Sequence, residues 1–216
     1  MKSIFITICV MVAAVSAHPA GIDIGTGFEV QLVSSQFTGT YTGNVTNAES
    51  LSAVATRLFA DWSLLEVYLR YSLMEASSEP SPGTSDPHYF AVSVSGLGLG
   101  AGIRIPLRLG AFEVFPIAAV EYNLNLSFVD DKGTSFQSLA DPATWFRFGG
   151  PWIYVGAGFD FATGSNLHLG LVAEYFINPL LLTAAPLQFV HPLGSLAYSA
   201  GSQGVSIQLR SSWSVP

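Results

Sequence analysis

Three of the four histidines are considered as general bases, and none of the three has a recognisable catalytic motif in the sequence. His88 and His191 lie next to prolines in the predicted long connections. His168 is followed by Leu169 and Gly170, which offer no nucleophile. A catalytic triad can assemble from distant segments, so spacing alone does not exclude one. We nevertheless predict no catalytic residue, no cofactor and no enzyme.

Acidic side chains dominate the segments that we expect to form loops, which raises the question of a divalent-cation site. The set comprises Glu49, Glu75, Glu79, Asp86, Asp130, Asp131 and Asp141, against Lys132. Asp130 and Asp131 are adjacent and could share an ion. Calcium sites, however, use several oxygen ligands at regular spacing, and the sequence has no such motif. We therefore predict solvated loop charge and no metal site.

The composition is that of a membrane protein. The chain has 216 residues, a formal net charge of −7 and 11% charged residues, whereas a soluble domain carries about 25%. Lys2 and Lys132 are its two lysines. This excludes a nucleic-acid binder, because such proteins need a clustered basic face. Half of the residues are hydrophobic, which excludes a disordered chain.

The N-terminus predicts export. Lys2 supplies a positive charge, residues 4–15 form a short apolar run, and residues 14–17 (Ala-Val-Ser-Ala) end in the small residues of a cleavage site. The run is too short to span about 30 Å of hydrocarbon as a retained anchor. We predict a signal peptide over 1–17, cut after Ala17, and one domain over 18–216. Cleavage would remove Cys9, the sole cysteine, which leaves no thiol for a disulfide or a metal.

The rest of the chain has the periodicity of strands. Every second side chain of residues 118–128 is apolar, and the alternate ones are Ala119, Glu121, Asn123, Asn125 and Ser127. A period of two indicates a β-strand with one apolar and one polar face. Alternation of this kind predicts eight strands, over residues 22–32, 51–60, 65–73, 90–105, 118–128, 153–161, 167–177 and 205–213.

One predicted strand changes phase. In residues 90–105, Phe90, Val92 and Val94 share one parity, whereas the apolar residues from Leu97 to Ile105 have the other. A β-bulge near Ser95 and Gly96 would turn all of these apolar side chains outward.

Long and short connections alternate along the chain. The long ones are residues 33–50, 74–89, 129–144 and 178–203, and the short ones are 61–64, 106–110 and 162–166. An even-stranded meander with short turns at one end and long loops at the other is typical of transmembrane barrels. The predicted fold class is therefore all-β: an eight-stranded antiparallel transmembrane up-and-down β-barrel with short periplasmic turns and four long extracellular loops.

Alternation also fits a soluble, lipocalin-like barrel with apolar faces inward. Such a barrel would need many Lys and Glu residues on its polar faces for solubility. Here those faces carry glycine, serine, asparagine and a few charges of both signs, which suits a packed polar lumen in which the charges pair. The predicted lumen-lining polar residues are Glu29, Arg57, Glu66, Tyr68, Arg70, Arg104, Glu121, Asn123, Asn125, Tyr154, Asp160, His168, Glu174 and Arg210.

With these strands the chain resembles the small eight-stranded outer-membrane proteins of diderm bacteria, the OmpA/OmpX/OmpW-like barrels, over about residues 21–213. The resemblance is one of architecture and pattern, without a diagnostic motif. It implies a place in the bacterial outer membrane, contact with its lipid, and recognition of the last strand by the assembly machinery. Such barrels usually end on an aromatic residue, whereas here Ser214, Val215 and Pro216 follow Trp213. Barrels of this kind that deacylate lipid A use a His-x-Ser motif, which His168 lacks.

Two functions stay open. The favoured OmpW-like branch implies a narrow conduit for small hydrophobic molecules, since an eight-stranded interior is too narrow for a general porin. The alternative is a structural or adhesive surface protein with a closed lumen, which presents loops to host or envelope partners. An apolar stretch in the last long loop could line a funnel, form a plug, or pack on lipid without binding a ligand. This candidate apolar loop site comprises Leu180, Leu181, Leu182, Leu187, Phe189 and Val190.

Overall fold

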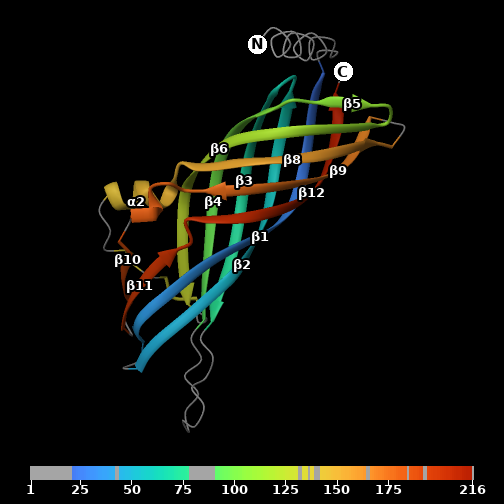
Figure 1. The fold of residues 1–216 in the computed structure, drawn as a ribbon. Helices are drawn as coiled ribbons and strands as arrows, with labels where there is room; N and C mark the ends of the chain where they lie inside the picture. The colour runs from blue at the N-terminus through green and yellow to red at the C-terminus, as the bar shows by residue number, and fades with distance from the viewer. Residues whose placement is uncertain are drawn as a thin grey trace.

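A computed structural model gives the fold (Figure 1). It describes residues 21–41, 44–77, 91–130, 133–135, 137–138, 142–163, 166–183, 185–191 and 194–215. The predicted signal peptide, residues 1–17, lies outside the described residues. Among the residues that are described, no helix is long and apolar enough to cross a bilayer.

Eight long strands close into an antiparallel barrel (Figure 1). They are β1 (Ile22–Tyr41), β2 (Asn44–Trp62), β3 (Leu65–Ser77), β4 (Ala91–Arg104), β6 (Phe112–Asp130), β8 (Trp152–Ala162), β9 (Leu167–Ile177) and β12 (Gln203–Val215). Each strand pairs with the next of this set, and β12 closes the ring by pairing with β1 from Val215↔Ile22 to Val205↔Leu32. The predicted eight-stranded meander is confirmed.

Short connections gather at the end of the barrel where β1 begins and β12 ends (Figure 1). Ser63 and Leu64 join β2 to β3, with Trp62 paired to Leu65. The short strand β5 (Leu107–Leu109) forms a hairpin with the start of β6. Gly110 turns this hairpin at φ +69°, a backbone conformation that glycine adopts without steric cost.

The outer wall of the barrel is apolar. Along β1 and β8, for example, Ile24, Phe28, Leu32, Val155 and Phe159 are exposed, while the side chains of alternate parity point inward. A closed barrel leaves no strand edge to be hydrated, and an outward apolar band is the surface that lipid covers. The structure is thus that of a membrane-spanning β-barrel whose outer wall contacts lipid.

Several strands continue well past the length needed to cross the membrane. β1 has 20 residues, roughly twice the 9–11 of a spanning strand. On the extracellular side β1 leaves β12 after Leu32 and pairs instead with β11 (Gly194–Ala200), from Ser35↔Ala200 onward. The predicted long connection over residues 33–50 is therefore wrong, because strands β1 and β2 fill nearly all of it.

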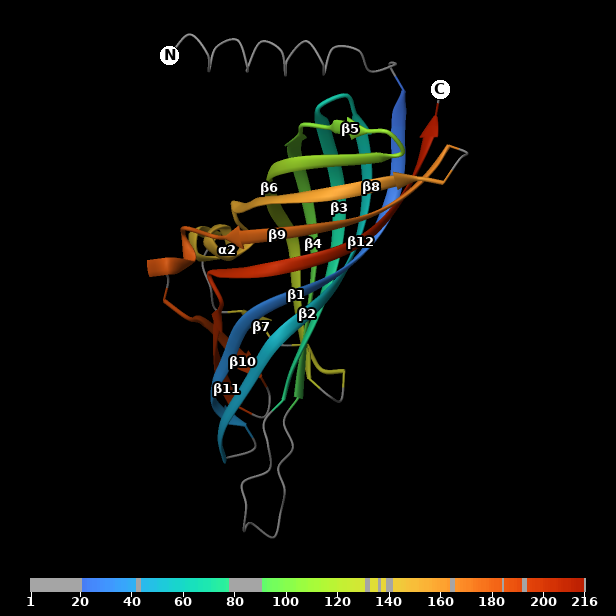
Figure 2. The same cartoon turned by 45° about the vertical axis from the view of Figure 1, so that its right-hand side comes forward.

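Further strands extend the sheet beyond the membrane-spanning part of the barrel, at the end away from the chain termini (Figure 2). β11 pairs with β10 (Leu187–His191), and β10 pairs with β7 (Gln137–Ser138). Just before β7, Ser135 bridges Val129 of β6. We call this part the extracellular extension. It is built from the ends of β1, β2, β3, β4 and β6 that lie away from the short turns, together with β7, β10 and β11. The helices α2 (Pro142–Gly149) and η1 (Leu181–Thr183) lie beside it, where β8, β9 and β12 stop.

Facing is inverted in the extracellular extension, where apolar side chains point inward. The buried cluster there includes Phe37, Val92, Val94, Phe128, Leu187, Phe189, Leu196 and Tyr198. Water, and not lipid, surrounds this part of the wall, so burial favours apolar side chains inside and polar ones outside. The predicted outward facing of Val92, Val94 and Phe128 is therefore wrong.

The bulge lies in β6, not in β4. The pair Leu97↔Asn125 is followed by Gly98↔Asn123, so Leu124 is the extra residue. β4 keeps one phase along its length, with Val92, Val94 and the glycines inward. The predicted bulge near Ser95 and Gly96 is wrong because the apolar side chains on its two sides meet different surroundings, lipid outside one part and protein inside the other.

Placing a charge on the lipid-facing wall should destabilise the inserted barrel. Val155→Arg puts a cation into the apolar band, and we expect it to lower the free energy of unfolding in lipid vesicles by about 2–4 kcal/mol. Thr38→Arg is the matched control, because Thr38 is exposed on the outer face of the extracellular extension. Equal losses for the two variants, measured by denaturant titration, would contradict the assignment of the band.

Candidate functional site

The lumen of the barrel holds a set of buried charged side chains. Four arginines and six carboxylates point inward and are each at most 6% exposed: Arg57, Arg70, Arg104, Arg210, Glu29, Asp61, Glu66, Glu121, Asp160 and Glu174. Nine of these ten were placed in the lumen from sequence; Asp61 was assigned to a turn. A buried charge is costly unless it is paired and hydrogen-bonded, so the arrangement of partners decides whether this lumen is stable.

Arg57 and Arg70 form the part of the network nearest the extracellular side. Arg57 donates to Glu29 at 3.3 Å and to Glu174 at 2.9 Å. Arg70 donates to Glu29 at 3.4 Å and to Glu121 at 2.5 Å. Glu29 therefore links the two guanidinium groups.

Arg104 and Arg210 continue the network toward the periplasmic turns. Asp61 Oδ2 accepts bonds from Arg104 at 2.7 Å and from Arg210 at 2.6 Å. Arg104 also contacts Glu113 and donates to Asp160 at 2.6 Å. Glu66 joins the two halves, because it accepts from Arg210 at 3.0 Å and lies 3.6 Å from Arg57. The contacts thus run without a break along the lumen.

Aromatic rings fill the space between the ions. The guanidinium carbon of Arg57 lies 4.3 Å from the centre of the Tyr68 ring, and that of Arg104 lies 4.0 Å from the centre of Phe115. Glycine makes room for them: a Cβ on Gly100 would lie 2.1 Å from Cζ of Tyr68. The glycines opposite the apolar residues of β4 therefore admit bulky neighbours, and the lumen at this level is packed with side chains.

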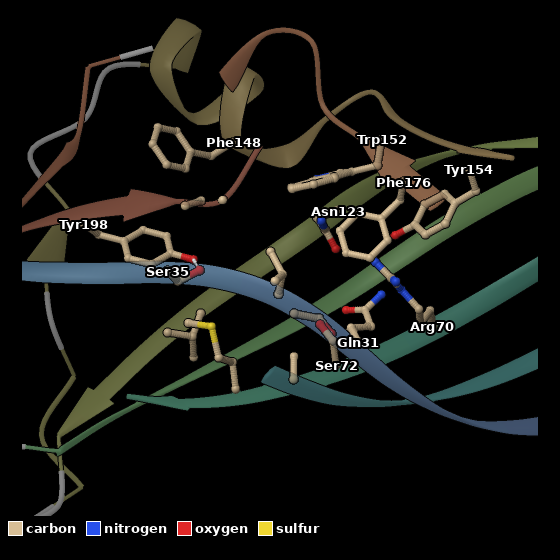
Figure 3. A pocket seen from close by; sticks show the side chains of 17 residues that line it. Gln31, Ser35, Arg70, Ser72, Asn123, Phe148, Trp152, Tyr154, Phe176 and Tyr198 are labelled. Atoms are coloured by element: carbon tan, nitrogen blue, oxygen red, sulfur yellow. Dashed lines mark hydrogen bonds between the residues drawn. The ribbon is translucent and has the colours of Figure 1, made fainter. Parts of the chain in front are cut away.

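A cavity of about 90 Å³ lies on the extracellular side of this network, at the junction with the extracellular extension (Figure 3). Arg70, Tyr154 and Gln31 border it on the side of the ions. Apolar side chains from several strands and from α2 form much of the rest of its lining, among them Ala53, Met74, Val94, Phe148 and Phe176. The cavity is therefore polar at one end and largely apolar elsewhere.

Packed aromatic side chains lie on the extracellular side of the cavity. Tyr198 of β11 stacks on Phe37 with ring centres 4.6 Å apart and lies 6.0 Å from Phe148 of α2. Its hydroxyl is 3.4 Å from that of Ser35, so the two share a hydrogen bond. Burial raises the pKa of the Tyr198 phenol, which keeps the hydroxyl protonated at neutral pH.

One side of the cavity borders a place where the strand ladder is interrupted. The pairing of β6 with β8 ends at Glu121↔Trp152. Asn123 of β6, Phe148 of α2 and Trp152 of β8 all line the cavity in this region (Figure 3). Side chains and the end of α2, not strand hydrogen bonds, thus close the wall at this point.

A buried asparagine holds α2 in this position. Asn178, fully buried at the end of β9, donates through Nδ2 to the carbonyl of Arg147 in α2 at 2.8 Å. Its Oδ1 accepts from the amide of Leu180 at 3.0 Å, and its own amide donates to Ser202. This role could not be predicted from the sequence, because Asn178 is the first residue of the predicted long connection over 178–203.

His168 lies near the periplasmic rim, away from the network. Its Nε2 is 3.1 Å from Oγ of Ser214, which in turn donates to Asp23 at 2.6 Å. Histidine, serine and aspartate thus meet from three strands, but the serine lies between the other two. A catalytic triad instead needs the histidine between the serine and the acid. The three side chains link β1, β9 and β12 near the chain ends.

Two other predicted lumen residues differ from the rest. Asn123 is half-buried and lines the cavity. The side chain of Asn125 lies outside the described residues. Among the described residues, no group of three or more His, Asp or Glu side chains is placed to hold a metal ion.

The candidate apolar loop site is divided by the fold. Leu181, Leu187 and Phe189 are buried in the cluster of the extracellular extension, and Leu180 is half-buried. Leu182 and Val190 are exposed, at 60% and 44%. These six residues do not line one common funnel, because alternate side chains of β10 point to opposite sides of its sheet.

Removing one arginine should test how far the barrel depends on the network. Arg57→Met leaves Glu29 and Glu174 without a main partner, and we expect a loss of about 3–5 kcal/mol in the free energy of unfolding. Arg108→Met is the control, since Arg108 is 56% exposed beside Glu113 and such a pair contributes at most about 1 kcal/mol. An Arg57→Met loss as small as that of the control would contradict the role of the network.

No protein-family model matches the chain, and no curated protein matches it in sequence. Solved structures of similar fold include OprG from Pseudomonas aeruginosa, at 10% identity over 92% of this chain and 97% of that one, with a TM-score of 0.47. Neisserial surface protein A matches at 12% identity over 84% and 96%, with a TM-score of 0.37. Ail of Yersinia pestis matches at 12% identity over 89% and 99%, with a TM-score of 0.31. The likeness extends to the fold alone, a small antiparallel β-barrel.

Proposed function

We propose that this outer-membrane barrel takes up small hydrophobic molecules through the side of its wall, as a conduit of the OmpW-like kind. The observation that carries the proposal is the position of the cavity. The cavity lies on the extracellular side of a lumen that is filled by paired ions. This position favours a path for the solute through the barrel wall over a path along the barrel axis. The free energy of transferring a hydrophobic solute along such a path is small, because much of the cavity lining and the surrounding lipid are both apolar.

The interrupted ladder beside β6 is the proposed passage. Asn123, Phe148 and Trp152 would form its frame, and small shifts of α2 would widen it without breaking strand pairs. Outside this frame Phe146 lies 5.7 Å from Tyr122, ring centre to ring centre, and is 53% exposed. These aromatic side chains would provide an apolar surface between the passage and the lipid.

A structural or adhesive role is the alternative. The extracellular extension favours it, because its packed interior would hold a rigid projection with a polar outer face above the membrane. A surface of this kind can present β1, β2 and β10 to partners of the host or the envelope. Binding of intact cells to host matrix would then depend on the extension and not on the cavity.

Export and assembly complete the proposal. Residues 1–17 would be removed as a signal peptide, leaving 18–216 as one barrel domain. Trp213 is exposed on the outer face of β12 and pairs with Ile24 and Leu167, so it is the aromatic residue that the assembly machinery would recognise in the last strand.

Filling the cavity should block uptake. Ala53 is 7% exposed and lines the cavity, so Ala53→Phe would occupy space that a solute needs. We expect the uptake of [14C]isobutene by cells with this variant to fall to the rate of cells without the protein. Ser52→Phe, at the neighbouring outward-facing position, should retain wild-type uptake. Wild-type uptake by a folded Ala53→Phe barrel would count against the conduit and favour the adhesive alternative.

A further inference from the structure

The cavity has hydrogen-bond donors without partners along one side. The hydroxyl of Tyr154, Nε1 of Trp152 and Nε of Arg70 are buried and make no hydrogen bond within the described structure. Tyr154 and Arg70 are only 1% and 4% exposed, and all three residues line the cavity. In Figure 3 they lie on one side of it, and the Tyr154 hydroxyl points toward its interior.

Buried donors of this kind favour a ligand that brings an acceptor. Leaving a buried donor unpaired is unfavourable, so an acceptor that approaches Tyr154 or Trp152 restores a bond that is otherwise missing. Ala53, Met74 and Val94 line the cavity with apolar side chains. A complementary molecule therefore has one acceptor group and an otherwise apolar body.

The charge of the lumen selects a neutral acceptor. The two carboxylates that contact Arg70, Glu29 and Glu121, already neutralise its guanidinium. Over the whole network six buried carboxylates face four arginines. A carboxylate or phosphate ligand would add a further negative charge to this excess in a poorly hydrated place, whereas a ketone, aldehyde or ester would not.

The volume limits the size of the ligand. A cavity of 150 Å³ accommodates benzene, which has six non-hydrogen atoms, so about 90 Å³ suits a molecule of about four non-hydrogen atoms.

We propose that this cavity is a binding site for small neutral carbonyl compounds, with the carbonyl oxygen accepting from Tyr154 and Trp152. The inference rests on the proposed function for the route by which such a compound reaches the cavity. It goes further by assigning the substrate class and the side chains that choose it.

Two isosteric probes separate the acceptor from the apolar body. Acetone carries a carbonyl oxygen where isobutene carries a CH₂ group, and the two molecules are otherwise alike. Met1 and Met11 fall within the predicted signal peptide, so Met74 is the methionine of the remaining chain. Its labelled methyl group reports any ligand in the cavity. The indole N–H of Trp152, assigned with Trp152→Phe, reports a hydrogen bond to the ligand.

In NMR titrations of the refolded barrel in micelles, acetone should shift both signals and bind at least about fivefold more tightly than isobutene. Tyr154→Phe should reduce this preference, while Tyr71→Phe, on the lipid-facing wall, should leave it intact. Trp152→Phe, read through Met74, provides a second variant should Tyr154→Phe not fold.

The outcomes separate the two proposals. Equal affinities with an unmoved Trp152 signal would overturn the carbonyl preference and leave hydrophobic uptake standing. A Met74 signal that neither probe moves would overturn both, because the cavity would then hold no solute.

Discussion

The pairing of four arginines inside a narrow barrel is the constraint on which the rest of the structure depends. An eight-stranded barrel has room inside for side chains and little else, so each guanidinium must find its carboxylates within the same small space. Arg57, Arg70, Arg104 and Arg210 each contact at least two. Because removal of one partner leaves a buried charge uncompensated, the network ties together residues from strands all around the barrel. It also fills the lumen, and so provides the floor of the cavity above it.

The change of solvent along the molecule explains why its two parts have opposite interiors. Lipid surrounds the membrane-spanning part of the barrel, which is therefore apolar outside and ionic inside. Water surrounds the extracellular extension, which is apolar inside, with Phe37, Phe128 and Tyr198 at its centre. The cavity lies where these two interiors meet. A site at such a junction is bordered by both kinds of surface, and this is the physical reason for its polar end and its apolar walls.

The strands and most of the lumen charges could be predicted from the sequence, because the two-residue period and the scarcity of charge are local signals. The alternation of Leu58, Leu69 and Val155 with inward-facing neighbours predicts a lipid-facing wall. The extension could not be predicted from the same rule, since Phe37 and Val92 obey the opposite one once the wall leaves the membrane. Asp61 was missed although it continues the inward parity of Arg57 and Phe59. The cavity depends on contacts between β1, β6, β9 and α2, which no local pattern specifies.

In our proposal, a barrel of this design is closed to ions and open to small hydrophobic solutes from the side. The most direct test is the current across a planar bilayer that holds the refolded protein, with a boiled sample as control and insertion verified by protection from protease. The account predicts a silent bilayer, because the paired ions leave no continuous aqueous path along the axis. Discrete conductance steps from the inserted barrel, absent from the boiled sample, would contradict a sealed lumen and would return the route of transport to the axis.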